Sequence, residues 1–343
     1  MSSVTRTIPS ETILAPELAV PSRFSDVIEL TKARLVTMVL VTTAVGYLLA
    51  EVGPVRWAML ALTLIGAGLA AGAAMALNQY LEVDADARME RTRERPLPAR
   101  RMSESMALLA ASTMGIGGTA LLLLAVDPLA AILAGGNIVL YAFVYTPLKR
   151  RTSFNTLVGA VTGGIPPMIG WAAASGTLDR GAWLLGAILF LWQIPHFLAL
   201  AWLYREDYRR GGFVMLPTID TGGSLTACVV VLSTLSLTPL ALMAVLGGLA
   251  GPPFALVAVL LGAGFAGLAF QMLRDRSDRA ARRVFLASLL YLPLLLGALV
   301  VDHERTMPRL RGDVALEASR SRVPSTADAV AAPRAARPTT ATP

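Results

Sequence analysis

The sequence is poor in the residues that a soluble or disulfide-stabilised protein needs. Its 343 residues contain one cysteine, Cys228, so an internal disulfide cannot form and a structural zinc site would lack thiolate ligands. Only 15% of the residues are charged, whereas 55% are hydrophobic and the mean hydropathy is +0.61. A soluble domain of this composition would expose far too much apolar surface. The composition therefore indicates a membrane protein.

Regular alternation of apolar and polar residues is also missing, which argues against a membrane β-barrel. Instead, apolar runs near twenty residues recur, and a run of this length spans the hydrocarbon of a bilayer as a helix. We predict an all-α fold, a polytopic helical bundle around a central cavity. We expect nine spans, at residues 33–50, 57–81, 104–125, 128–146, 155–174, 181–203, 224–246, 253–272 and 284–301.

The two ends of the chain differ from the apolar middle. Residues 1–30 lack the apolar core that a cleavable signal peptide needs. This segment and residues 303–343 are rich in Pro, Ser, Thr, Ala and Arg, so we expect both to be disordered. Residues 31–302 then form one intramembrane domain.

Basic residues give the chain a net charge of +7, and they lie on alternate loops. If the N-terminus is cytoplasmic, 21 of them lie on the cytoplasmic side, and the opposite loops carry only Arg56 and Arg180. The positive-inside rule therefore predicts a cytoplasmic N-terminus and cytoplasmic charged loops, with the C-terminal tail outside after nine spans. Because topology explains these charges, we do not expect nucleic acid as a partner.

A charged stretch, NQYLEVDADARMERTRERPLPAR, follows the second span. On a continuing helix, Asn78, Glu82 and Asp86 share one face because they are four residues apart, whereas Asp84 points elsewhere. Such oxygen ligands suit Mg²⁺, which usually binds through a few carboxylates plus substrate phosphates. The arginines that follow suit the phosphate oxygens. The alternative is a solvated helix end whose acids pair with these arginines.

A second charged cluster, containing Glu206 and Asp207, ends the sixth span in the same compartment. His196 lies near the same helical face as Asp207, about 16 Å away along the axis, with Gln193 beyond it. Polar groups inside the membrane are costly and usually face a cavity or a partner. Imidazole is the usual protein ligand of haem iron, so one interpretation of His196 is a porphyrin ligand. The other is a hydrogen-bonded packing residue.

Two further stretches fit the same site. One ends a span on the same side of the membrane as the charged clusters, and the other indicates a helix that lines a cavity or packs on its neighbours. The fourth span ends in YTPLKR, where Lys149 suits a diphosphate, although a basic residue after a span is also an ordinary stop signal. The fifth span contains GGIPP. Its two prolines free backbone groups, which is tolerated where a helix lines a cavity or packs on neighbours.

Together these stretches resemble the intramembrane aromatic prenyltransferase superfamily, and most closely its haem-modifying branch. The resemblance covers roughly residues 30–300 and rests on NQYLEVDADARMERTRERPLP, YTPLKR, GGIPPMIGW and WQIPHFLALAWLYREDYRRGGFVMLP. The superfamily motif Asn-x-x-x-Asp-x-x-x-Asp reads here as Asn78, Glu82 and Asp86. The second motif, Asp-x-x-x-Asp, is not matched, because Glu206 and Asp207 are adjacent and no acid lies four residues from Asp207.

The resemblance implies a Mg²⁺-dependent enzyme that transfers the farnesyl group of farnesyl diphosphate to a vinyl group of haem B, giving haem O and diphosphate. The implied catalytic residues are Asn78, Glu82, Asp86, Asp207 and Lys149. The implied metal ligands are Asn78, Glu82, Asp86, Glu206 and Asp207. Of the adjacent acids we favour Asp207, because it shares a face with His196.

The remaining implied roles concern the two substrates. The diphosphate is expected at Arg91, Arg95, Lys149 and Arg150, and the haem at His196 and Gln193. The ring faces of Tyr145 and Tyr208 are suited to stabilise cationic character. The implied setting is the cell membrane, with membrane lipid around the chain and a downstream haem A synthase as a further partner.

Three alternatives stay open at this point. A sister enzyme that prenylates an aromatic or quinone precursor would need the same diphosphate site and no haem ligand. A transporter also uses broken helices and buried polar groups, but here the acids cluster at one membrane face rather than at the midplane. A non-catalytic assembly factor would not explain two acidic clusters.

Overall fold

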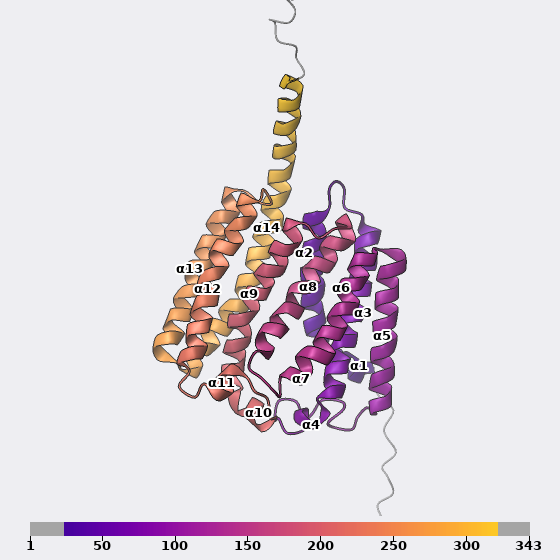
Figure 1. The fold of residues 1–343 in the computed structure, drawn as a ribbon, viewed down its shortest axis with the longest axis vertical. Coiled ribbons are helices and arrows are strands. Elements are labelled where there is room, and N and C mark those ends of the chain that lie inside the picture. The colour runs from indigo at the N-terminus through magenta and orange to yellow at the C-terminus, as the bar shows by residue number, and fades with distance from the viewer. Residues whose placement is uncertain (1–23, 322–343) are drawn as a thin grey trace, which may run out of the picture.

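The computed structural model describes residues 24–321, with side chains through residue 305, and this part of the chain is helical without strands (Figure 1). Nine of its helices are long and apolar enough to cross a membrane, which confirms the predicted all-α multi-pass bundle. The spans are α2 (Ala33–Ala50), α3 (Trp57–Leu81), α5 (Glu104–Ala125), α6 (Pro128–Val139) with the π-helix η1 (Leu140–Tyr145) and α7 (Thr146–Leu148), α8 (Asn155–Ser175), α9 (Arg180–Leu203), α12 (Ser224–Leu246), α13 (Pro252–Asp275) and α14 (Asp278–Ser321).

Four short helices gather at one end of the bundle with α7: α1 (Phe24–Leu30), α4 (Val83–Asp86), α10 (Arg205–Arg210) and α11 (Leu216–Ile219) (Figure 1). The C-terminal end of α14 projects from the opposite end (Figure 1). The charged stretches after α3, α7 and α9 therefore share one face, as the loop charges predicted.

The ends of the bundle are more ordered than the composition predicted. Helix α1 occupies residues 24–30 of the segment expected to be disordered, and its Leu30 is wholly buried. At the other end, α14 continues through residues 303–321. Asp302 accepts a hydrogen bond from the Gly251 backbone N–H, and His303 Nδ1 lies 2.7 Å from the Leu249 carbonyl oxygen. The rest of the predicted disordered segments, residues 1–23 and 322–343, lies outside the described residues.

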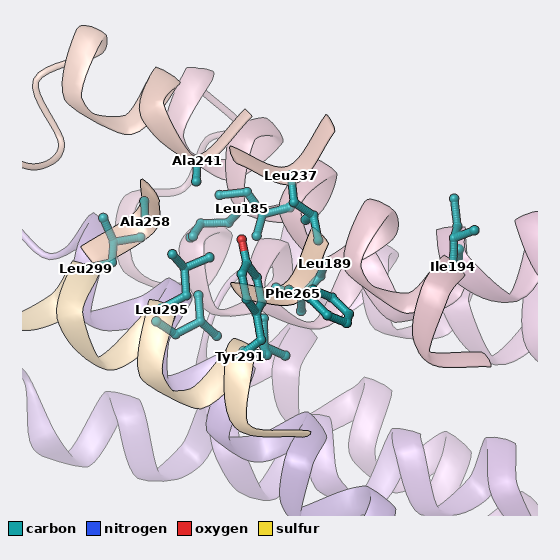
Figure 2. Close-up of a cluster of buried hydrophobic side chains, with 14 of the residues drawn as sticks. Leu185, Leu189, Ile194, Leu237, Ala241, Ala258, Phe265, Tyr291, Leu295 and Leu299 are labelled. Carbon is teal, nitrogen blue, oxygen red and sulfur yellow. The ribbon is translucent and has the colours of Figure 1, made fainter. Parts of the chain in front are cut away.

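Two regions of close packing hold the bundle together. Side chains of α9, α12, α13 and α14 form one core around Leu185, Leu237 and Tyr291 (Figure 2). Between α2 and α8 the backbones themselves meet: a Cβ atom on Gly46 would lie 1.9 Å from the Pro167 carbonyl oxygen, and one on Gly170 would lie 1.8 Å from that of Thr43. Small residues allow this approach, as is usual between membrane helices.

The prolines of the GGIPP stretch lie inside an uninterrupted α8, and both are buried. Gly163 leaves room for Gln193 of α9, since a Cβ there would lie 1.7 Å from the Gln193 amide nitrogen. This stretch therefore packs against neighbouring helices, which is the second of the two roles expected for it.

Candidate active site

The first acidic cluster forms where α3 gives way to α4. Glu82 interrupts the helix with φ −108° and ψ 8°, yet its N–H still bonds to the Asn78 carbonyl at 3.1 Å, and its own carbonyl accepts from Asp86 at 2.8 Å. The four-residue spacing is therefore kept. Asn78, Glu82 and Asp86 are all buried, whereas Asp84, which was predicted to point elsewhere, is exposed. We call these three buried residues the acidic column.

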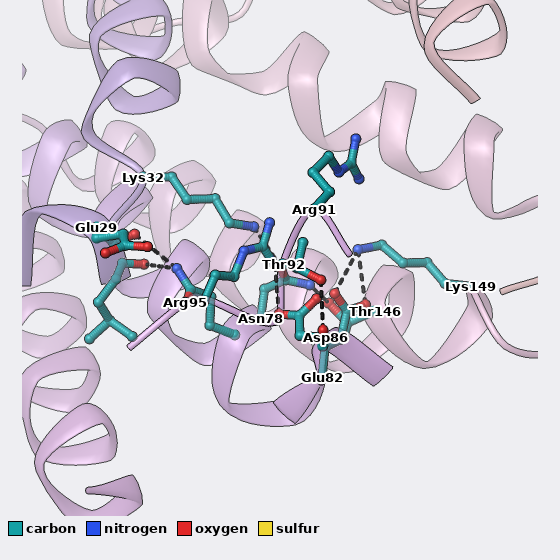
Figure 3. Close-up of polar contacts among 12 residues, drawn as sticks. Glu29, Lys32, Asn78, Glu82, Asp86, Arg91, Thr92, Arg95, Thr146 and Lys149 are labelled. Atoms are coloured by element: carbon teal, nitrogen blue, oxygen red, sulfur yellow. Dashed lines mark hydrogen bonds and ion pairs between the residues drawn. The ribbon is translucent and has the colours of Figure 1, made fainter. Parts of the chain in front are cut away.

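Each member of the acidic column meets a basic side chain from elsewhere in the chain (Figure 3). Lys149 Nζ lies 2.9 Å from Glu82 Oε1, and Arg95 Nη1 lies 2.6 Å from Asp86 Oδ2. Asn78 accepts a hydrogen bond from Lys32 Nζ at 2.9 Å and donates one to Thr146 Oγ1 at 3.0 Å. The structure thus brings the predicted Lys149 and Arg95 to the column.

Lys32 and Thr146 also belong to this site, and the sequence analysis missed both. Lys32 was counted only as a topology signal, because 46 residues separate it from Asn78. Thr146 lies inside the YTPLKR stretch, which was the available signal for it. Burial, and then the charges of Arg95 and Lys149, lower the pKa of Lys32 to about 7.

Lys149 is held by aromatic rings as well as by Glu82. Its Nζ lies 4.7 Å from the ring centre of Tyr145 and 5.6 Å from that of Phe213. Burial alone would lower the pKa of Lys149, but the facing Glu82 carboxylate raises it above its usual value. Tyr145 ends the π-helical turn η1, a distortion often found at functional sites. Its ring therefore lies at the site, in contact with a cation.

The adjacent acids of the second cluster have different surroundings. Glu206 is exposed and pairs with Arg209 at 2.5 Å, so the structure does not bring this predicted metal ligand to the column. Asp207 is buried and accepts from the backbone N–H groups of Glu90 and Arg91, at 3.3 and 3.4 Å. Asp207 therefore fixes the loop that carries the predicted diphosphate-binding arginines.

Asp207 is buried and Glu206 is exposed, which agrees with the preference for Asp207 as a site residue. The structural reason for that preference, however, was wrong. It assumed one helix from His196 to Asp207, but α9 ends at Leu203, and Tyr204 (φ −111°, ψ 24°) separates it from α10. Shared helical faces do not continue across this break.

Arg91 and Arg150, two of the predicted diphosphate ligands, lie apart from the acidic column. Arg91 Nη2 donates to the Tyr208 hydroxyl at 3.1 Å, and its guanidinium lies over the rings of Tyr204 and Tyr208. Burial would lower the pKa of Arg91, but Tyr208 raises it. Figure 3 shows Arg91 directed away from Asp86. Arg150 is exposed and makes no contact with the column within residues 24–305.

The donor atoms at the column suit a divalent cation that arrives with its own oxygen ligands. Within the described residues, no three acidic, His or Cys side chains are close enough to form a complete metal site. However, Asp86 Oδ1 is buried and receives no hydrogen bond. Mg²⁺ usually binds through one or two carboxylates plus substrate phosphates, so this oxygen and the neighbouring Glu82 carboxylate, which pairs with Lys149, fit it.

The predicted haem residues face different neighbours. His196 Nδ1 lies 2.8 Å from Ser288 Oγ of α14, and its ring lies against Trp192 and Phe285, with centroids 4.9 and 5.0 Å away. Gln193 instead packs on Gly163 of α8. The structure therefore does not bring His196 and Gln193 to one common contact.

The chain is similar over most of its length to known enzymes. It is 43% identical over 282 residues to a protoheme IX farnesyltransferase of Opitutus terrae, covering 82% of this chain and 95% of that one. It is 44% identical over 267 residues to the mitochondrial protoheme IX farnesyltransferase of Homo sapiens, covering 78% and 60%.

Solved structures share the fold at low sequence identity. A UbiA homolog from Archaeoglobus fulgidus bound to DMAPP and Mg²⁺ has a TM-score of 0.60 at 13% identity, covering 80% of this chain and 99% of that one. A digeranylgeranylglyceryl phosphate synthase structure has a TM-score of 0.69 at 14% identity, covering 81% and 98%. The sequence pattern of the UbiA prenyltransferase family matches residues 39–297. The chain is therefore a member of the UbiA prenyltransferase family.

Proposed function

We propose that this prenyltransferase moves the farnesyl group of farnesyl diphosphate to a vinyl carbon of haem B. With one water added, the products are haem O and diphosphate. The observation that carries the proposal is the match, at 41–44% identity over about 80% of the chain, to relatives named protoheme IX farnesyltransferase. The buried acidic column with its facing cations supplies a site of the right chemistry.

The bond that breaks joins the allylic carbon of the farnesyl chain to a diphosphate oxygen, and negative charge grows on that oxygen. Positive groups aimed at the leaving group stabilise this charge, most strongly where water is excluded. Lys149 and Arg95 lie at the column, and each pairs there with a carboxylate. We assign them to the departing diphosphate. Arg91 precedes Arg95 on the same loop and donates a hydrogen bond to Tyr208.

Glu82, Asp86 and Asn78 are the groups suited to hold Mg²⁺. When bound there, the ion would supply Lewis-acid stabilisation of the diphosphate oxygens. Asp207 acts differently, since its oxygens bind the backbone of Glu90 and Arg91. We assign it to positioning the arginine loop rather than to the first set of metal ligands.

The acceptor step needs a dry, apolar environment, because water would trap an allylic cation before it met the porphyrin. The spans above the column provide this environment. Attack by the vinyl carbon moves the positive charge next to the porphyrin ring, and water then adds as hydroxide equivalent, releasing a proton. Tyr145, whose ring contacts Lys149, is suited to stabilise cationic character.

We further propose that the chain resides in the cell membrane with α4 and α10 on the cytoplasmic side. The basic loops at that end of the bundle support this orientation. A haem A synthase that receives haem O directly is a proposed partner.

The test is an incubation of purified protein with haem B, farnesyl diphosphate and Mg²⁺, followed by mass spectrometry of the extracted haem. We expect a product heavier by one farnesyl group plus one hydroxyl group, and none when EDTA is present. Unchanged haem from protein that binds farnesyl diphosphate would contradict the haem assignment. An aromatic or quinone precursor, offered in the same assay, would then be the acceptor to examine.

A further inference from the structure

Lysine is rare in this chain. Of its thirty Lys and Arg residues only two, Lys32 and Lys149, are lysines. Both reach the acidic column, one from the start of α2 and one from the end of α7 (Figure 3). Lysine and arginine are not equivalent, because the ammonium group is a compact charge on a flexible stem with three donors. The convergence of both lysines on one site indicates a role for Lys32 beyond topology.

Lys32 differs from the other cations at the column in its partner. Lys149 and Arg95 each pair with a carboxylate, at 2.9 and 2.6 Å. Lys32 has only the neutral amide oxygen of Asn78, and it forms no ion pair among residues 24–305. An ammonium group that is partly removed from water without a carboxylate in direct contact is unfavourable, although the Glu82 and Asp86 carboxylates act on it from farther away. An anionic ligand at this position would supply the missing charge.

The backbone that joins α1 to α2 fixes the position of Lys32. Lys32 has a left-handed conformation, φ 51° and ψ 55°, which is strained for a residue with a side chain. Two residues earlier the chain is fixed, because Gln79 Nε2 donates to the carbonyl oxygens of Glu29 and Leu30 at 2.9 and 2.8 Å. Gln79 and Leu30 are both wholly buried. The strained turn is therefore imposed by the folded structure around it.

Arg101 joins α1 to the loop that carries Arg95. It forms ion pairs with Asp26 and Glu29 of α1, the latter at 2.6 Å, and donates to the Glu94 carbonyl at 2.8 Å. Arg95, which follows Glu94 in the chain, forms an ion pair with Asp86. One side chain thus links the segment before Lys32 to the segment before Arg95, and Figure 3 shows Lys32 and Arg95 converging above Asn78.

We propose that Lys32 binds the diphosphate of the prenyl donor, and that α1 and Arg101 form a clamp that holds Lys32 and Arg95 over the acidic column. Lys32 is then a substrate-binding residue. Arg101 and Gln79 are positioning residues, since they act through Lys32 and Arg95. This inference rests on the diphosphate half of the proposed function and does not depend on the acceptor.

The first test measures binding of inorganic pyrophosphate with Mg²⁺ to the full chain in lipid nanodiscs by titration calorimetry. Losing a charge-assisted bond should weaken binding about tenfold or more in Lys32→Gln, and Lys32→Arg should recover part of it. Arg34→Gln removes an exposed basic residue two positions away and should bind as the unaltered protein does. Unchanged pyrophosphate affinity in Lys32→Gln would overturn the proposal.

A second test uses the unaltered protein, so it does not depend on variants that fold. An amine-acylating reagent has only Lys32, Lys149 and the terminal amine to modify. Mass spectrometry measures how fast each amine is acylated. Pyrophosphate with Mg²⁺ should slow the acylation of Lys32. Protection of Lys149 without protection of Lys32 would contradict the proposal.

The clamp is tested through additivity. Arg101→Gln should raise the KM for farnesyl diphosphate, while Arg93→Gln, an exposed residue of the same loop, should not. Because Arg101 acts partly through Lys32, the loss of pyrophosphate affinity in the double variant Arg101→Gln/Lys32→Gln should be smaller than the sum of the two single losses. Fully additive losses would indicate a merely structural role. A chain that binds pyrophosphate as expected but makes no haem O would refute the proposed acceptor and leave this inference standing.

Discussion

His196 and Ser288 form a hydrogen bond between α9 and α14, with 2.8 Å between Nδ1 and Oγ. The Ser288 hydroxyl donates its one hydrogen to the Phe285 carbonyl at 2.6 Å, so it accepts from His196. The proton of the imidazole is then on Nδ1, and Nε2 keeps its lone pair. A neutral imidazole fixed in this way has the form that metal ligation requires.

This relationship predicts graded losses of haem binding. His196→Ala should abolish the haem absorbance change on titration with haem B, while farnesyl diphosphate binding stays intact. Ser288→Ala removes only the partner of Nδ1, and outer-shell changes of this kind typically cost about tenfold or more in affinity. Equal haem affinity in all three proteins would make His196 a packing residue.

Charge at Glu82 should matter more than side-chain length. Glu82→Gln leaves Lys149 without its carboxylate and weakens the metal site, so we expect kcat to fall about 100-fold or more. Glu82→Asp restores the residue usual in the family motif and should keep most of the activity. Asp84→Asn, an exposed neighbour, is the matched control. Turnover of farnesyl diphosphate at saturating Mg²⁺ measures all three.

The adjacent acids of α10 should differ sharply in effect. Asp207→Asn weakens the bonds that hold the backbone of Glu90 and Arg91, so we expect kcat/KM for farnesyl diphosphate to fall about tenfold or more. Glu206→Gln loses only an exposed pair with Arg209 and should stay within about twofold. A larger loss in Glu206→Gln than in Asp207→Asn would show that the buried acid was misassigned.

Close helix packing predicts which glycines tolerate a methyl group. In Gly170→Ala the new carbon would collide with the Thr43 carbonyl, so we expect at least the 1–3 kcal/mol typical of overpacking and a lower Tm, if the protein accumulates. Gly264→Ala meets nothing within 4 Å and replaces a poor helix former, so its Tm should stay equal or rise. Thermal unfolding in detergent compares the two variants.

The nine spans were predictable because length and apolarity are local properties of the sequence. All nine agree with the structure, and the largest shift is at α14, which runs from Asp278 to Ser321 rather than from residue 284 to residue 301. The acidic column was predictable for the same reason, since a four-residue spacing places side chains together within one helix. Its backbone bonds survive the interruption at Glu82.

Contacts between distant segments were not predictable from one sequence. The bond from Lys32 to Asn78 and those from Glu90 and Arg91 to Asp207 join residues 46 to 117 positions apart. The direction of His196 was also hidden, because a helical face says nothing about which neighbour covers it. The break at Tyr204 has no Gly or Pro beside it, so nothing in the sequence announced it.

The ion pairs at the column would make Mg²⁺ and diphosphate, the two ligands proposed for it, depend on each other. Mg²⁺ alone would take the carboxylates from Lys149 and Arg95 and leave two cations without partners. Diphosphate alone would take those cations and leave Glu82 and Asp86 as bare buried anions. Only the two together restore charge balance, so we expect their binding to be cooperative, with each strengthening the other by the same factor. We therefore expect neither metal nor free diphosphate to accumulate at this site without the other.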